Sequence, residues 1–185
     1  WLNRLSMPKL QLPADSPALQ LIKQSLSHCD AEVHLIDITN DCGIPTVLAV
    51  LRSKAYGFPL TTVGLAAKTD FDSAASKAFC EAVSDYERIR VHLAEQGDGY
   101  WRPKPDFSDV TDFPWHGMAY ICPLMQQQLS FIWQSEHYSV RGPQHAITGQ
   151  SSAQQLLHCL LQLQPLVSEI VAVDLAPRDV AALGV

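Results

Sequence analysis

Three charged side chains recur along one predicted helix at a spacing that brings them together. Glu81, Asp85 and Arg88 follow each other at steps of four and three residues. In an α-helix of about 3.6 residues per turn, such steps place side chains on one face. Two carboxylates on one face can hold Mg²⁺, which takes carboxylate oxygens together with phosphate oxygens and water. Since the planar guanidinium of Arg88 suits an anionic oxygen, the three residues are candidates for a metal- and phosphate-binding site.

The same helical face also supports a structural interpretation. Lys77 lies four residues before Glu81, and Arg88 follows the second carboxylate after three residues. Such pairs stabilise a solvated helix by only about 0.2–0.5 kcal/mol each and need no ligand. An exposed ladder of charges therefore stays open as the alternative to a metal site.

A long amphipathic helix over residues 71–96 must carry this face. Asp70 or Asp72 supplies its N-terminal cap, and Gly97 ends it. Apolar side chains recur along it at three- and four-residue steps, at Ala75, Ala78, Phe79, Ala82, Val83, Tyr86, Ile89 and Leu93. This periodicity predicts one buried stripe on the helix, opposite the charged face.

The sheet that this helix covers is predicted from three β-rich runs. Residues 33–38 and 44–51 are separated by the turn-forming residues 40–43, which indicates two strands joined by a turn. Residues 61–69 form a third strand, in which Gly64 leaves room for another group to come close. The predicted fold class is α/β, with one mixed sheet faced by helices.

The N-terminal part divides into an arm and the start of the domain. Residues 1–14 carry two prolines and little periodicity, so we expect an arm or linker remnant there. Asp15-Ser16-Pro17 then caps a helix over about 17–28. We expect residues 15–185 to be one fragment of a larger domain.

The C-terminal part gives weaker signals. Residues 124–133 predict a short helix or strand, and 135–150 are polar. Ser151 and Ser152 cap a helix that Pro165 ends. Residues 170–175 predict a strand, and 178–183 predict a turn of helix that stops at Gly184.

A long stretch without periodicity, residues 97–117, is the other candidate for function. Its Trp101, Trp115 and His116 either grip a peptide or fold back over the core, and the sequence leaves both alternatives open. His34, within an apolar strand, is expected to be a hydrogen-bonded core residue rather than a base.

Composition excludes several classes of protein. The chain has 185 residues, a formal net charge of −6 and 47% hydrophobic residues, as expected for one globular domain. Because Lys and Arg are in the minority, nucleic-acid binding is not expected. No run reaches the roughly 18 apolar residues of a membrane span. Five Cys without a CxxC pair indicate reduced thiols in a cytoplasmic protein rather than disulfides or a zinc site.

Several features in one order resemble the YcaO family. The run Asp37-Ile38-Thr39-Asn40-Asp41-Cys42-Gly43-Ile44-Pro45 is similar to the family's D-T-x-D-x-G-I-P turn. Gly64 follows in a strand of small residues, and Ala74 to Ala82 resembles the family's A-x-x-x-A-x-x-E-A helix. The similarity covers residues 31–96 and extends to 168–185.

The resemblance implies part of an ATP-dependent, Mg²⁺-dependent cyclodehydratase, which turns Cys, Ser or Thr of a precursor peptide into azolines, as in bacteriocin biosynthesis. Glu81 matches the helix Glu that helps to hold metal and nucleotide, and Arg88 is a weaker match for an Arg on phosphate. Implied partners are the precursor peptide and a leader-binding protein, and a homodimer is compatible with this assignment. We expect the chain to be a C-terminal fragment that is inactive in isolation.

Two alternatives remain. The family often places Gln three residues after this Glu, where the chain has Ser84, and residues 1–30 hold no counterpart of the family's other acidic helix. A non-catalytic YcaO-like domain that binds a peptide or a partner enzyme is therefore one alternative. A small-molecule enzyme of another type is the second, and it requires that the helix over 71–96 does not lie across the three predicted strands.

Overall fold

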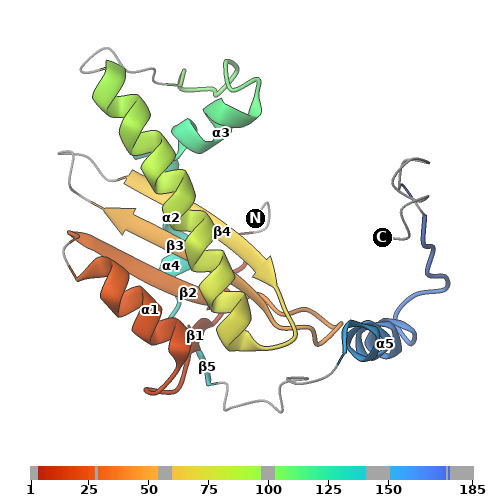
Figure 1. Ribbon diagram of the computed structural model, residues 1–185. Coiled ribbons are helices and arrows are strands. Elements are labelled where there is room, and N and C mark those ends of the chain that lie inside the picture. Colours follow the sequence, from red (N-terminus) through yellow and green to blue (C-terminus); the bar gives the residue numbers. More distant parts are fainter. Residues whose placement is uncertain are drawn as a thin grey trace, which may run out of the picture.

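The computed structural model describes residues 4–27, 29–53, 60–96, 103–140, 151–173 and 175. It contains a five-stranded mixed sheet in the order β4-β3-β2-β1-β5 (Figure 1). The strands are β1 (Lys9–Gln11), β2 (Ala31–Asp37), β3 (Thr46–Ser53), β4 (Leu60–Ala67) and β5 (Tyr138–Val140). The pairing of β1 with β5 is parallel and the other pairings are antiparallel. The predicted mixed sheet faced by helices is confirmed.

Helices cover the two faces of the sheet unequally (Figure 1). The helices are α1 (Pro17–Leu26), α2 (Phe71–Gln96), α3 (Phe113–Ala119), α4 (Pro123–Trp133) and α5 (Ser152–Leu163). Helix α3 packs against α2, and α5 lies to one side of the sheet (Figure 1). Helices α1 and α2 share one core cluster with alternate residues of β3, namely Val47, Ala49 and Leu51. The intervening Leu48 and Val50 pack with α4 on the opposite face, as the two-residue period of a strand requires.

Helix α2 lies across β3 and β4, which confirms the arrangement that the family resemblance requires. Of the two candidate caps, Asp70 caps the helix, because its Oδ1 accepts from the backbone N–H of Ser73 at 2.7 Å. The predicted stripe packs into the core, with Ala78 and Ala82 at 0% exposure and Val83 and Tyr86 partly buried. A Cβ at Gly64 would lie 2.6 Å from the backbone nitrogen of Ala82, so the predicted close approach at this glycine is also confirmed.

The motif 37–45 shapes the turn between β2 and β3. The Asp37 carboxylate accepts from the backbone N–H of Thr39 at 3.0 Å, and the Thr39 hydroxyl accepts from Thr46 N–H at 3.1 Å. Gly43 has a φ of 67°, a left-handed conformation that suits glycine. These motif residues therefore fix the backbone of the turn, and Asp37, which is 2% exposed, is a structural residue.

Three short elements lie where no regular structure was predicted. Strand β1 forms within the segment 1–14, and β5 forms within the polar residues 135–150. Helix α3 begins in the stretch 97–117, which lacks helical periodicity, and ends at Ala119. The uncertain segment 124–133 is helical, as α4.

The predicted strand at residues 170–175 is wrong. Its described residues form no strand, and Ile170, Val171 and Val173 are exposed. A β-type sequence needs a neighbouring strand for its backbone hydrogen bonds, and none of the described strands pairs with this segment. Helix α5 is capped by Ser151, one of the two predicted caps, with a capping box to Gln154. The predicted turn of helix at 178–183 lies outside the described residues.

None of the described helices combines the length and the hydropathy that a bilayer span needs.

Candidate functional site

A pocket of about 540 Å³ opens where α2, α3 and the edge of β4 meet. It contains all three charged residues predicted from the sequence. The lining residues are Val63, Glu81, Asp85, Arg88, His116, Gly117 and Tyr120. Its volume is in the usual range for small-molecule sites, roughly 300–1,000 Å³.

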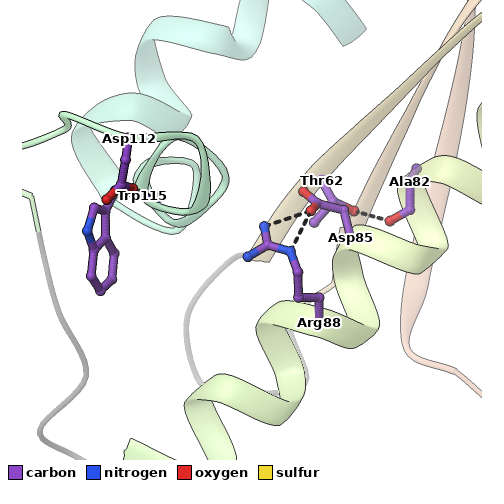
Figure 2. Close-up of polar contacts among 6 residues, drawn as sticks. All are labelled: Thr62, Ala82, Asp85, Arg88, Asp112 and Trp115. Carbon is purple, nitrogen blue, oxygen red and sulfur yellow. Dashed lines mark hydrogen bonds and ion pairs between the residues drawn. The ribbon is translucent and has the colours of Figure 1, made fainter. Parts of the chain in front are cut away.

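The position of Glu81 and Asp85 follows from how α2 sits on β4. The absence of a side chain at Gly64 lets the α2 backbone touch the strand. Next to it, the Thr62 hydroxyl donates to the Ala82 carbonyl at 2.8 Å, a contact buried between helix and strand (Figure 2). Because this contact fixes both the distance and the rotation of α2, its charged face lies at the outer edge of β4.

Glu81 binds the backbone of that edge strand. Its Oε2 accepts from the backbone N–H of Leu65 at 3.2 Å, and its Oε1 lies 3.4 Å from Lys77 Nζ. The carboxylate is partly exposed, with 43% of its side chain accessible. The Lys77–Glu81 ion pair of the structural interpretation is therefore present, and the Glu81 carboxylate also lines the pocket.

Asp85 and Arg88 form an ion pair at the wall of the pocket (Figure 2). Arg88 donates from Nη2 to Asp85 Oδ1 at 2.7 Å and from Nε to the same oxygen at 3.1 Å. The backbone of Gly117 closes over the pair, since a Cβ there would lie 2.6 Å from Arg88 Nη2 and 3.3 Å from Asp85 Oδ2. Only glycine leaves the guanidinium its present position.

Helix α3 supplies the opposite wall. The Asp112 carboxylate caps it by accepting from the Trp115 N–H at 3.1 Å (Figure 2). Trp115 packs against the core cluster of Ile89 and Leu93, and its ring meets His92 edge-on at 6.1 Å. Of the two alternatives for these aromatic residues, Trp115 follows the core-covering one. His116 next to it is exposed and lines the pocket, and Trp101 lies outside the described residues.

Sequence reasoning missed Gly117 and Tyr120, since nothing in the local pattern shows that α3 lies over α2. Tyr120 is half-buried, and burial raises the pKa of its hydroxyl, with the Asp85 charge as the second cause. The hydroxyl is therefore a neutral hydrogen-bond donor at the pocket wall over the physiological pH range.

In the described ranges, no three His, Cys, Asp or Glu side chains gather closely enough to hold a metal by themselves. Two carboxylates, Glu81 and Asp85, are what the pocket offers. Mg²⁺ keeps several waters and is commonly bound through one or two carboxylates plus substrate phosphates. The donor set therefore fits a magnesium ion that arrives with a phosphate, and Arg88 supplies a matching cation for that phosphate.

His34, away from the pocket, departs from its prediction. Burial lowers the pKa of its imidazole, with an opposing effect from Glu32 and smaller lowering effects from Arg52 and Lys9. Its Nε2 lies 3.6 Å from Glu32 Oε1 and has no hydrogen-bond partner among the described residues. At Nε2 the expected hydrogen bond is therefore only a longer contact with the Glu32 carboxylate. The ring instead stacks on Trp133 of α4, with centroids 6.5 Å apart.

Comparisons with known proteins give a family and a fold. The sequence model described as YcaO cyclodehydratase, ATP- and Mg²⁺-binding, matches residues 1–185. By sequence, no curated protein matches the chain. A structure described as a heterocyclase in complex with substrate and cofactor aligns with a TM-score of 0.56 and 21% identity, over 89% of this chain and 20% of its own.

A second structure, that of the heterocyclase TruD, aligns with a TM-score of 0.55 and 17% identity over the same shares of the two chains. These alignments show a shared fold, and the chain spans about a fifth of the length of either structure.

Proposed function

The chain belongs to the YcaO family, and from this premise we propose that its α2–α3 pocket binds the phosphates of ATP with Mg²⁺ for a peptide cyclodehydratase. ATP and Mg²⁺, the cofactors that the resemblance implies, are those named for the family. The observation that carries the proposal is that Glu81, Asp85 and Arg88 all line one pocket.

The proposed roles follow from the chemistry of each group. Glu81 and Asp85 would supply carboxylate oxygens to Mg²⁺, and Arg88 would bind phosphate oxygens with its planar fork. Gly117 supports these roles because its missing side chain keeps the space over Arg88 open. His116 and the Tyr120 hydroxyl stand at the same wall as further donors.

Both carboxylates have partners that a ligand would replace. Asp85 is held by Arg88, and Glu81 is held by Lys77 and the Leu65 amide. Ion pairs this exposed contribute only about 0–1 kcal/mol each, so their exchange for metal and phosphate costs little. Arg88 would pass from Asp85 to a phosphate while Asp85 passes to the metal, which keeps each charge paired.

The proposed reaction forms an azoline in the peptide. The sulfur or oxygen of a Cys, Ser or Thr side chain attacks the preceding amide carbon, and its proton is lost. When bound, ATP would supply the phosphoryl group that makes the amide oxygen a leaving group, and would become ADP. The carbon–oxygen bond then breaks as phosphate leaves, the amide nitrogen loses its proton, and a carbon–nitrogen double bond completes the azoline. In the pocket, Arg88 and the two carboxylates would orient the phosphates and offset the charge that develops on them. The proposed substrate is a precursor peptide, presented by a leader-binding protein in the cytoplasm.

Calorimetric titration of the full-length parent with ATP and Mg²⁺ tests the assignment. Glu81→Ala and Asp85→Asn should each weaken Mg²⁺–ATP binding at least tenfold. Glu87→Gln is the matched control, since Glu87 pairs with Arg90 on the same helix and does not line the pocket. Unchanged binding in Glu81→Ala, with a folded protein by circular dichroism, would reject the metal role.

A non-catalytic domain is the second candidate, and Ser84 favours it. The Ser84 hydroxyl donates to the Cys80 carbonyl at 2.8 Å and does not line the pocket, so it cannot replace the Gln that the family resemblance leads one to expect. Under this hypothesis the parent protein binds peptide or a partner enzyme without hydrolysing ATP. Phosphate release on addition of peptide to the parent protein distinguishes the two candidates.

A further inference from the structure

An apolar groove of about 420 Å³ opens on the face of the sheet that α4 covers only in part. Strands β2 and β3 form its floor, β4 one side and α4 another. Its lining includes Ile36, Leu48, Val63, Leu65, Phe131 and Ile132. Among the described residues, those that line the groove carry no charge, so it matches an uncharged, apolar occupant.

The groove lies along an edge of the sheet. Strand β4 is the last strand in the order and pairs with β3 on one side. The backbone N–H of Leu65 is directed to the Glu81 carboxylate instead of a strand, and the Leu65 side chain is 53% exposed. An edge of this kind can accept an extended peptide by main-chain hydrogen bonds, with side-chain pockets providing specificity.

The groove adjoins the polar pocket. Val63 lines both cavities, and Leu65 lines the groove while its amide contacts Glu81 of the pocket. Because successive residues of a strand are about 3.3 Å apart, a peptide with one side chain in the groove brings an amide one or two residues away to the pocket.

We propose that this groove and the β4 edge bind an extended segment of the substrate peptide, with an apolar side chain seated in the groove within two residues of the residue that cyclises. The inference rests on the proposed function and deepens it by assigning a substrate preference. A backbone carbonyl of the peptide would take the place of the Glu81 carboxylate on the Leu65 amide, which leaves that carboxylate free for the metal.

Peptide is favoured over a second copy of the chain by the position of the groove. The shared wall at Val63 puts the occupant's backbone beside Glu81, Asp85 and Arg88, where a reacting amide is needed. Pairing of β4 between two copies would use the same edge, and it would be visible as a dimer.

Fluorescence anisotropy of labelled peptides with the full-length parent tests the inference. Two eight-residue peptides each contain one Cys and differ only next to it, where one has Leu and the other Gln. We expect the Leu peptide to bind at least fivefold more tightly. Leu65→Asn and Leu5→Asn, both at exposed groove positions, should abolish this difference, and Val91→Asn, at an exposed position of α2 outside the groove, should leave it intact.

Equal binding of the two peptides, or a preference that survives both groove variants, would overturn the inference. It would also be overturned if light scattering shows that Leu65→Asn converts a dimer to a monomer while peptide binding is unchanged, since the groove would then join two copies. Titration with Mg²⁺–ATP of the wild type and the same variants separates the two proposals. Normal nucleotide binding without a peptide preference rejects the groove proposal alone. Absence of nucleotide binding in the wild type rejects the proposed function.

Discussion

The two faces of the sheet differ in how completely helices cover them. On the face under α1 and α2, small residues let helices and sheet come close: Ala18, Ala74, Ala75, Ala78 and Ala82 are all 0% exposed. On the other face, α4 covers Leu48 and Val50 but leaves Leu65 accessible beside a groove. The closed face fixes α2 and with it the charged pocket, while the open face offers apolar surface to a ligand. We expect stability to depend on the first and binding on the second.

The largest expected effect comes from the centre of the closed face. Phe79→Ala removes a side chain that is 2% exposed in the core of α1, α2 and β3, and such truncations cost about 3–5 kcal/mol. Urea denaturation followed by circular dichroism measures the loss. A cost below about 1 kcal/mol would mean that this face is not the tightly packed one.

Gly64→Ala should cost about 1–3 kcal/mol, because the added Cβ meets backbone atoms of α2 that cannot yield locally. The helix must move away from β4, and Glu81, whose Cβ lies 2.8 Å from the added atom, moves with it. We therefore expect weaker Mg²⁺–ATP binding together with the lower urea midpoint. Normal values of both would show that α2 is not fixed at this glycine.

Gly117→Ala is the matched change at the pocket. Here the added Cβ meets the tip of Arg88, which is flexible, and alanine is favoured over glycine in a helix by up to about 1 kcal/mol. Stability should be unchanged or slightly higher, while ATP affinity falls several-fold because Arg88 is displaced. A stability loss as large as that of Gly64→Ala would erase the distinction between the two sites.

A pH-dependent difference should arise on the α4 face at His34. Because burial lowers the pKa of this imidazole in the folded protein, the unfolded chain binds more protons as pH falls below the ordinary value, and the folded state loses stability. Between pH 7 and pH 5 the urea midpoint of the wild type should fall more than that of His34→Gln. Parallel curves for the two proteins would contradict this assignment.

The smallest expected effect belongs to the groove. Leu65→Asn changes a side chain that is 53% exposed, so its effect on stability should stay within about 0.5 kcal/mol. Differential scanning calorimetry, beside the same measurement on Phe79→Ala, quantifies the contrast. A large loss of stability in Leu65→Asn would mean that Leu65 contributes to the core and is not an open binding surface.

The sequence predicts an element of this fold when the residues that determine the element lie within one segment of the chain. The bounds of α2 follow from the cap at Asp70 and a long apolar stripe, both readable within one segment. Strands β1 and β5 have three residues each and exist because Lys9 meets Tyr138 across the chain, so no window of sequence contains their cause. The opposite holds for residues 170–175, where a local β-type pattern is present but no strand forms, because no described strand pairs with it.

The candidate site divides in the same way. Spacing on one helix was enough to predict that Glu81, Asp85 and Arg88 share a face, and the structure places all three in one pocket. Gly117 and Tyr120 reach that pocket only because α3 lies over α2, a tertiary contact that their own sequence neighbourhood does not encode. Which of these residues bind metal and phosphate stays a prediction that the titrations above decide.

The seam between β1 and β5 has a consequence for how the chain reaches its fold. It is the parallel pair of the sheet, and beside it the Ser139 hydroxyl donates to Asp37 at 2.7 Å, 102 residues away. Closing so long a loop carries an entropic penalty that nearby hairpins such as β2–β3 avoid. We therefore expect the β1–β5 pairing to form last during refolding and to open first in the native state. The backbone amides of β1 and β5 should exchange with deuterated solvent well before those of β3.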